Sequence, residues 1–147
     1  GFSNGMMFDA ARRRFYCNDT FKGTWAFDVA ADGMLQNRAL LLDKEDADGM
    51  CLDAAGNVWI TGFRSSHFTR LTPQGERLAD FPTPAGSITQ LRFGGADGRD
   101  IYFNSVPSDG GDTLKDGGEI TEANSFLFRG RSDTAGLKIE PARFTLG

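Results

Sequence analysis

Short apolar runs separated by turns rich in glycine and aspartate recur along the whole chain. No stretch of ten or more residues has the apolar spacing of an amphipathic helix. The runs contain bulky aliphatic and aromatic residues, which are typical of buried strands. The clearest of them are residues 6–8, 14–19, 24–29, 39–42, 50–53, 58–63, 88–93, 101–106 and 125–129. The pattern predicts an all-β chain.

Three of these runs repeat one pattern at a regular distance. The aligned segments are Asn4-Gly5-Met6-Met7-Phe8, Asp48-Gly49-Met50-Cys51-Leu52 and Thr89-Gln90-Leu91-Arg92-Phe93. Their first residues are 44 (48 − 4) and 41 (89 − 48) positions apart, close to the roughly 40–45 residues of one four-stranded propeller blade. The repeat therefore predicts a partial β-propeller domain with three four-stranded blades, at roughly residues 1–45, 46–86 and 87–147.

Three blades do not close a ring, because a propeller needs about four to eight. The two end blades would expose aromatic-rich sheet, which natural proteins rarely leave bare. We therefore expect this chain to be half of a larger assembly. The partner would be a missing N-terminal half or a second copy of the chain, and two copies would bring two Asn4 and two Asp48 side chains into one channel.

Asn4, Asp48 and Thr89 occupy the same repeat position on the strands expected to line the channel, so they are predicted to converge on one axial site. Carboxylate and amide oxygens suit Ca²⁺ or Mg²⁺. Asn-Gly and Asp-Gly are also common hairpin turns, so the same residues are compatible with plain turns. Asp19 follows an apolar strand, where it would either line the channel or cap the strand end.

The remaining candidates favour structural roles. His67 is the only histidine and has no nucleophilic serine motif near it, which argues against a catalytic triad. Trp25 and Trp59 are expected in the core between blades. Cys17 and Cys51 fit no disulfide or metal spacing and are predicted to be buried free thiols, as in a reducing compartment.

Charge and hydropathy exclude two partner classes. The net charge of −4 leaves no basic field for nucleic acid, and the arginine run at residues 12–14 is interpreted as a solvated turn. No run approaches the ~20 apolar residues of a membrane span, so a cytoplasmic location is the default expectation. The Gly- and Asp-rich insertion at residues 107–124 would be either a lid over the channel or a surface loop.

Several motifs together resemble one known family over nearly the whole chain. They are Ser3-Asn4-Gly5, Phe15-Tyr16-Cys17-Asn18-Asp19-Thr20, Trp25-Ala26-Phe27-Asp28, Asp48-Gly49-Met50-Cys51-Leu52-Asp53, Ala54-Ala55-Gly56-Asn57-Val58-Trp59 and Phe93-Gly94-Gly95. The chain is similar to the C-terminal half of the senescence marker protein/gluconolactonase/regucalcin family.

That resemblance implies a six-bladed propeller with one divalent cation in its channel, usually Ca²⁺, with Mg²⁺, Zn²⁺ or Mn²⁺ as alternatives. It implies hydrolysis of sugar lactones or related esters. By the resemblance, Asn4 is a metal ligand, and Asp48 is both a ligand and the general base. The family's first ligand, a glutamate, and its substrate-contacting arginine and asparagine would precede Gly1. The second function compatible with the resemblance is a calcium-binding or structural propeller without turnover.

Overall fold

The computed structural model describes residues 1–107 and 125–139, which form three antiparallel sheets and no helix. The first sheet contains β1 (Phe2–Asp9), β2 (Arg14–Thr20), β3 (Gly23–Val29) and β4 (Leu35–Leu42). The second contains β5 (Ala47–Leu52), β6 (Val58–Gly62), β7 (His67–Leu71) and β8 (Phe81–Pro82). The third contains β9 (Ile88–Gly94), β10 (Asp100–Ser105) and β11 (Phe126–Arg131).

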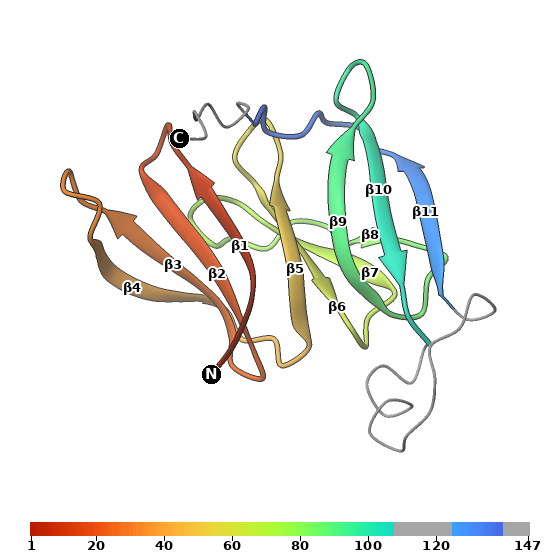
Figure 1. Cartoon of the computed structure of the whole chain (residues 1–147), viewed down its shortest axis with the longest axis horizontal. Helices are drawn as coiled ribbons and strands as arrows, with labels where there is room; N and C mark the ends of the chain where they lie inside the picture. Colours follow the sequence, from red (N-terminus) through yellow and green to blue (C-terminus); the bar gives the residue numbers. More distant parts are fainter. Residues whose placement is uncertain (108–124, 140–147) are drawn as a thin grey trace, which may run out of the picture.

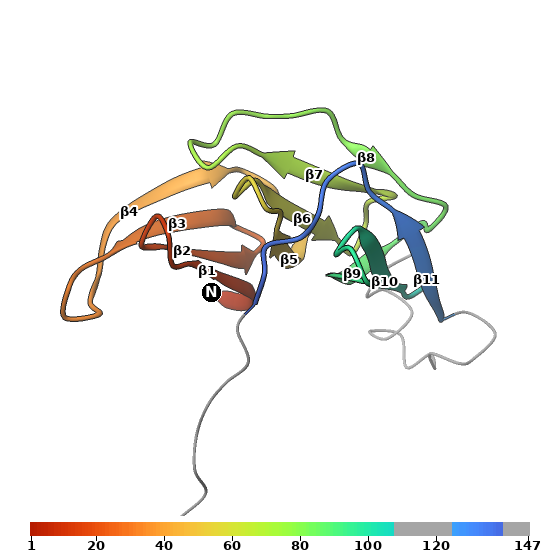
Figure 2. The ribbon, with the colours of Figure 1, turned by 90° about the horizontal axis from the view of Figure 1, so that it is seen from above.

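Each sheet follows chain order, and neighbouring strands within it are antiparallel (Figure 1). Seen from above, the three sheets fan out with β1, β5 and β9 on the inner side of the arc (Figure 2). These first strands contact one another in succession, β1 with β5 and β5 with β9. The prediction of an all-β propeller fold is confirmed.

Two details of the strand pattern differ from the prediction. The third sheet has three strands within the described residues, where four were expected. The second sheet has the expected four strands, but its fourth, β8, covers only Phe81–Pro82. Before β8, the turn at residues 72–76 reverses the chain. After this turn the chain pairs with the end of β7 in a single bridge, between Arg77 and Leu71.

Two apolar cores hold the sheets together. The core between the first and second sheets contains Tyr16, Met50 and Val58, and the core between the second and third is built around Trp59. The Trp59 ring is fully buried and lies 5.2 Å from the Phe93 ring and 5.5 Å from the Phe81 ring, measured between centroids. The prediction that Trp59 belongs to the core between blades is confirmed.

Trp25 belongs to neither of these two cores. Trp25 pairs with Cys17 and Leu40 on the face of the first sheet that points away from the second, where it is only half-buried. The Arg38 guanidinium covers its ring, with 4.5 Å from Cζ to the ring centroid. Cys17 lies half-buried on this face, whereas Cys51 is buried, and both are free thiols.

The described part of the chain includes no helix that is long and apolar enough to cross a membrane. Of the insertion expected at residues 107–124, residues 108–124 lie outside the described residues.

Candidate functional site

The three residues predicted to converge lie at an irregularity of the strand pairing in all three sheets. The β1–β2 register shifts between Ser3 and Met6, which brackets Asn4. The β5–β6 register shifts between Ala47 and Met50, which brackets Asp48. On β9, Thr89 has no partner on β10, because Gln90 faces Asn104 and Ile88 faces Ser105. Bulges of this kind re-aim side chains and are frequent beside active sites.

The glycines after Asn4 and Asp48 lie within strands, so the hairpin-turn interpretation of these dipeptides was wrong. Their role is close contact between inner strands. A Cβ on Gly5 would lie 2.6 Å from the carbonyl oxygen of Asp48, and one on Gly49 would lie 2.6 Å from that of Thr89. A side chain at either position would separate the inner strands, so glycine lets the three candidate residues approach one another.

Asp48 carries the most perturbed carboxyl group of the site. Burial raises its pKa from 3.8 to about 6, a hydrogen bond from the Asn4 side chain partly offsets this, and the charge of Asp46 adds to it. Within the described residues, no lysine or arginine forms an ion pair with Asp48. The group is therefore a half-buried carboxylate next to an amide, able to exchange a proton near neutral pH.

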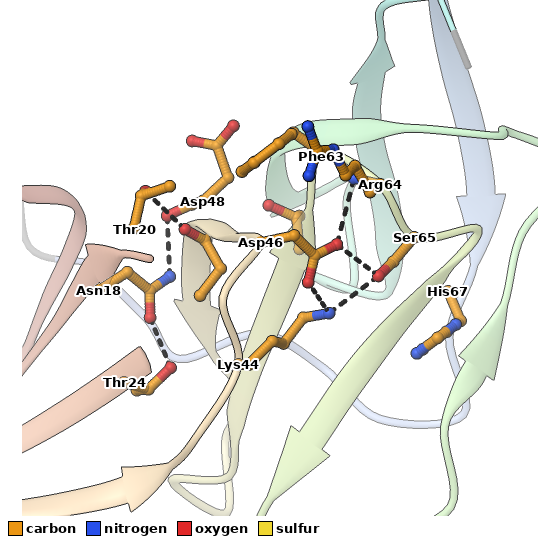
Figure 3. A network of polar contacts seen from close by, with 12 residues as sticks. Asn18, Thr20, Thr24, Lys44, Asp46, Asp48, Phe63, Arg64, Ser65 and His67 are labelled. Atoms are coloured by element: carbon orange, nitrogen blue, oxygen red, sulfur yellow. Dashed lines mark hydrogen bonds and ion pairs between the residues drawn. The ribbon is translucent and has the colours of Figure 1, made fainter. Parts of the chain in front are cut away.

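The backbone at Asp48 is fixed by a buried side chain of the first sheet. Asn18, fully buried on β2, donates from Nδ2 to the carbonyl oxygens of Asp48 at 2.8 Å and Gly49 at 3.3 Å (Figure 3). Thr24 completes the arrangement by donating its hydroxyl to Asn18 Oδ1 at 2.6 Å. Because both ends of the amide are bonded, its orientation is determined, and so is the position of the β5 bulge.

The other side of the bulge is held from the second sheet. The Thr61 hydroxyl accepts a hydrogen bond from the Gly49 N–H at 2.8 Å and lies 3.2 Å from the carbonyl oxygen of Thr89. Sequence reasoning missed Asn18 and Thr61. One sequence feature could have pointed to them. Asn18 and Thr61 are short polar residues at the same repeat position in the otherwise apolar second strands of the first and second sheets.

Asp46, two residues before Asp48, has a different environment. Burial opposes its ionisation, but hydrogen bonds from Lys44 and Ser65 outweigh burial, so its pKa lies below the ordinary value. Lys44 Nζ lies 2.5 Å from Asp46 Oδ1 and 2.8 Å from Ser65 Oγ (Figure 3). Asp46 is thus an ionised, paired carboxylate that orders the loop before β5, and it leaves Asp48 as the group available for chemistry.

The other candidates take structural positions. Asp19 Oδ1 accepts a hydrogen bond from the Phe2 N–H at 2.7 Å, which ties the first residue of β1 to β2, and its other oxygen lies 3.6 Å from Lys22 Nζ. The Thr89 hydroxyl accepts from Asn104 Nδ2 at 2.9 Å. His67 Nε2 lies 3.6 Å from Asp80 on the outer part of the second sheet.

The oxygen donors of Asn4 and Asp48 are of the type that a hard cation binds, but two of them are too few to complete its coordination. Among the described residues, no group of three or more His, Cys, Asp or Glu side chains is placed to hold a metal ion. Asn4 and Asp48 offer one amide and one carboxylate oxygen donor, which Ca²⁺ and Mg²⁺ accept, whereas Ca²⁺ takes 6–8 oxygen ligands. The chain thus provides part of a cation site.

Comparisons of the chain with family models and with known proteins agree on one family. The family model described as SMP-30/gluconolactonase/LRE-like region matches residues 1–106. Regucalcin of Danio rerio is 33% identical over 111 residues, covering 71% of this chain and 38% of that protein. Pentonolactonase XacC of Haloferax volcanii is 30% identical over 137 residues, covering 88% of this chain and 47% of that protein. The chain thus spans less than half the length of these relatives.

Solved structures share the fold. A luciferin-regenerating enzyme superposes with a TM-score of 0.72 at 20% identity, over 96% of this chain and 50% of that one. A calcium-binding protein, regucalcin, from Agrobacterium tumefaciens superposes with a TM-score of 0.68 at 18% identity, over 95% of this chain and 48% of that one.

Proposed function

Because the chain belongs to the SMP-30/gluconolactonase/LRE-like family, we propose that it forms the cation- and base-bearing part of a hydrolase for sugar lactones or related esters. The observation that carries this proposal is the carboxyl group of Asp48. It lies on a bulge beside Asn4, has a pKa of about 6 and has no cationic partner among the described residues. Relatives named as lactonases support the substrate class.

Asn4 and Asp48 would hold the divalent cation through their side-chain oxygens. Ca²⁺ is the first choice because both donors are hard oxygens, with Mg²⁺, Mn²⁺ and Zn²⁺ as alternatives to be tested. When bound, the cation would polarise the lactone carbonyl. Further ligands would come from water or from the rest of the ring.

Asp48 would also act as the general base. Without a cation the Asp48 carboxyl has a pKa of about 6 and is mostly ionised at neutral pH. A bound cation would lower this pKa, so the carboxylate would be fully ionised and able to accept a proton, but it would be a weaker base. It would take a proton from the water whose oxygen attacks the carbonyl carbon. As the ring C–O bond breaks, the leaving ring oxygen would take that proton, which yields the hydroxy acid.

Asn18, Thr24 and Thr61 would act as positioning residues. They hold the backbone at Asp48 and Gly49 from both sides, and none of their side chains is exposed to the solvent. A base must lie within hydrogen-bond reach of the water that it deprotonates, so this support would keep the Asp48 carboxylate in place. A cytoplasmic location is part of the proposal and is supported by two cysteines that form no disulfide.

The test is hydrolysis of a sugar lactone such as gluconolactone, followed by proton release, in the protein with Ca²⁺, after chelation and after Ca²⁺ is returned. We expect activity to be lost with the chelator and restored by Ca²⁺, and to fall at least about 100-fold in Asp48→Asn. Unchanged hydrolysis in Asp48→Asn would refute the role of Asp48. Calcium binding without hydrolysis would favour the second candidate, a non-catalytic calcium-binding propeller, which the calcium-binding regucalcin neighbour supports.

A further inference from the structure

The loop between β6 and β7 is held against the segment that leads into Asp48 by a polar cluster. Asp46 Oδ2 accepts hydrogen bonds from the Ser65 hydroxyl at 2.6 Å and from the Arg64 N–H at 3.1 Å. Lys44 Nζ pairs with Asp46 and lies 2.8 Å from Ser65 Oγ. The ion pair is largely buried, with 12% of the Lys44 side chain and 16% of the Asp46 side chain exposed. Because breaking a buried ion pair is strongly unfavourable, this cluster fixes the loop.

The three residues 45–47, which lead directly into Asp48, are bonded to both of the first two sheets. The first of their carbonyl oxygens accepts from the Phe21 N–H at 2.8 Å, and the last accepts from the Thr20 hydroxyl at 2.7 Å. The middle carbonyl oxygen accepts from the Phe63 N–H at 3.1 Å. The β2–β3 hairpin of the first sheet and the β6–β7 loop of the second are therefore attached to the same three residues.

The two phenylalanines bonded to this segment meet each other. The rings of Phe21 and Phe63 contact edge to face, with 6.1 Å between their centroids. The Arg64 guanidinium lies over the Phe63 ring, with 5.2 Å from Cζ to the centroid. Figure 3 shows the Phe63 side chain and the Asp48 carboxyl at the same end of β5. We call the rings of Phe21 and Phe63 the aromatic wall. It stands at the junction of the first and second sheets, both of which the structure describes in full.

The backbone at Phe21 is strained. Its φ of 74° lies in the left-handed region, which a bulky side chain rarely occupies and which glycine adopts freely. The hairpin therefore keeps a phenyl ring at a position where glycine would fit with less strain. Strain of this kind is concentrated at active sites and ligand-binding sites, where the side chain has a task to perform.

The aromatic wall presents carbon and few polar groups. Its two backbone N–H groups are bonded to the segment before Asp48, and the Phe63 carbonyl oxygen accepts a hydrogen bond from the Ser87 hydroxyl. A sugar hydroxyl placed against the rings would lose its hydrogen bonds to water without replacing them. An aryl or alkyl group in the same place would gain free energy by leaving water. The wall therefore favours an apolar ligand group beside Asp48.

We propose that Phe21 and Phe63 bind an apolar substituent of the substrate, so that the preferred substrates are lactones whose ring carries an aryl or alkyl group. This inference rests on the proposed hydrolysis at Asp48 and specifies the substrate class of that same site. The substituent would lie against the two rings while the lactone carbonyl faces Asn4 and Asp48. Phe21 and Phe63 are thus specificity-determining residues and take no part in proton transfer.

The test separates binding at the wall from hydrolysis by using two cyclic ethers that cannot be hydrolysed. They are 2-phenyltetrahydrofuran and 2-(hydroxymethyl)tetrahydrofuran, and their dissociation constants are measured by NMR titration of the protein with Ca²⁺. An aromatic contact of this kind is expected to make the phenyl ether bind about 3- to 10-fold more tightly than the hydroxymethyl ether. Hydrolysis of γ-phenyl-γ-butyrolactone and of gluconolactone is followed separately by proton release.

Three variants and a control locate the preference. Phe21→Gly removes one ring and suits the φ of 74°, so the hairpin should keep its shape. Phe21→Gly and Phe63→Ala should each weaken binding of the phenyl ether about 3- to 10-fold and leave the hydroxymethyl ether unchanged. Phe63→Leu should keep part of the preference, because leucine is also apolar. Met34→Ala, at a 64% exposed position on the turn before β4, should bind as wild type does. Far-UV circular dichroism checks folding.

The outcomes distinguish this inference from the proposed function. Equal binding of the two ethers to wild type, or no binding, would overturn the inference even if gluconolactone is hydrolysed. Phe21→Gly and Phe63→Ala variants that both bind the phenyl ether as tightly as wild type would also overturn it. A preference for the phenyl ether that both variants lose, without hydrolysis of either lactone, would support the aromatic wall and refute the proposed function.

Discussion

Replacing Asp48 by asparagine should stabilise the metal-free protein at neutral pH. The pKa of Asp48 is raised by burial, so folding favours its protonated form. A carboxyl group of this kind contributes stability that is complete below its unfolded pKa and is lost as pH rises through its folded pKa of about 6. Asparagine has nearly the same shape and carries no charge, so the variant avoids this loss.

The size of the effect follows from the shift. A rise from 3.8 to about 6 corresponds to roughly 3 kcal/mol, at 1.36 kcal/mol per pH unit. The side chain is only partly buried, so solvent screening reduces this to about 1–2 kcal/mol. The free energy of unfolding of Asp48→Asn, minus that of wild type, should therefore be close to zero near pH 4. It should grow to about 1–2 kcal/mol at pH 7.5.

Urea denaturation followed by tryptophan fluorescence, in the presence of a chelator, measures this difference at each pH. Carboxylates with lowered pKa values that do not interact with Asp48, such as Asp100, are common to both proteins and cancel. The matched control is Asp43→Asn on the exposed part of the loop before β5, which should change stability by less than about 0.5 kcal/mol at either pH. A difference that is independent of pH, or a wild type that is more stable at pH 7.5, would refute the reasoning.

The geometry of the site leads to three further predictions. Because a proton competes with the cation for Asp48, the affinity for Ca²⁺ should fall up to about tenfold per pH unit below pH 6, as calorimetry can measure. Gly49→Ala should lower the free energy of unfolding by at least about 1–3 kcal/mol, since its Cβ would lie 2.6 Å from the Thr89 carbonyl oxygen. Gly130→Ala, where the nearest atom is 3.7 Å away, is its control in thermal melts. Asn18→Ala should cost about 1–3 kcal/mol by leaving the Asp48 carbonyl unbonded, and it should weaken Ca²⁺ binding measurably.

The fold was accessible from sequence because the repeat carries it. Three aligned apolar runs at a blade-like spacing placed β1, β5 and β9 and brought Asn4, Asp48 and Thr89 to one repeat position. Trp25 lies outside the two cores because it is on the side of the first sheet that points away from the second. An aromatic residue in a strand does not reveal which face of its sheet has a neighbour among the described residues. β8 is short because the chain before it pairs with β7 only through the Leu71–Arg77 bridge and the hydrogen bond from the Leu78 N–H to the Arg70 carbonyl oxygen.

The site was less predictable than the fold. The motif around Asp48 was visible, but its raised pKa depends on burial and on Asn4, which lies on a different sheet. The contacts of Asn18 and Thr61 join residues 30 and 28 positions apart in the chain. No local pattern encodes such distances, although the repeat equivalence of the two residues becomes evident once the strand registers are known.

Isothermal titration calorimetry with Ca²⁺ at pH 7.5, comparing wild type with Asp48→Asn and Asn4→Ala, tests the central claim most directly. That claim is that these two side chains hold a divalent cation at the channel. The account predicts saturable binding to wild type that Asp48→Asn abolishes and Asn4→Ala weakens, while Asp43→Asn binds as wild type does. Equal affinity in all four proteins, or no binding to wild type as isolated, would contradict it.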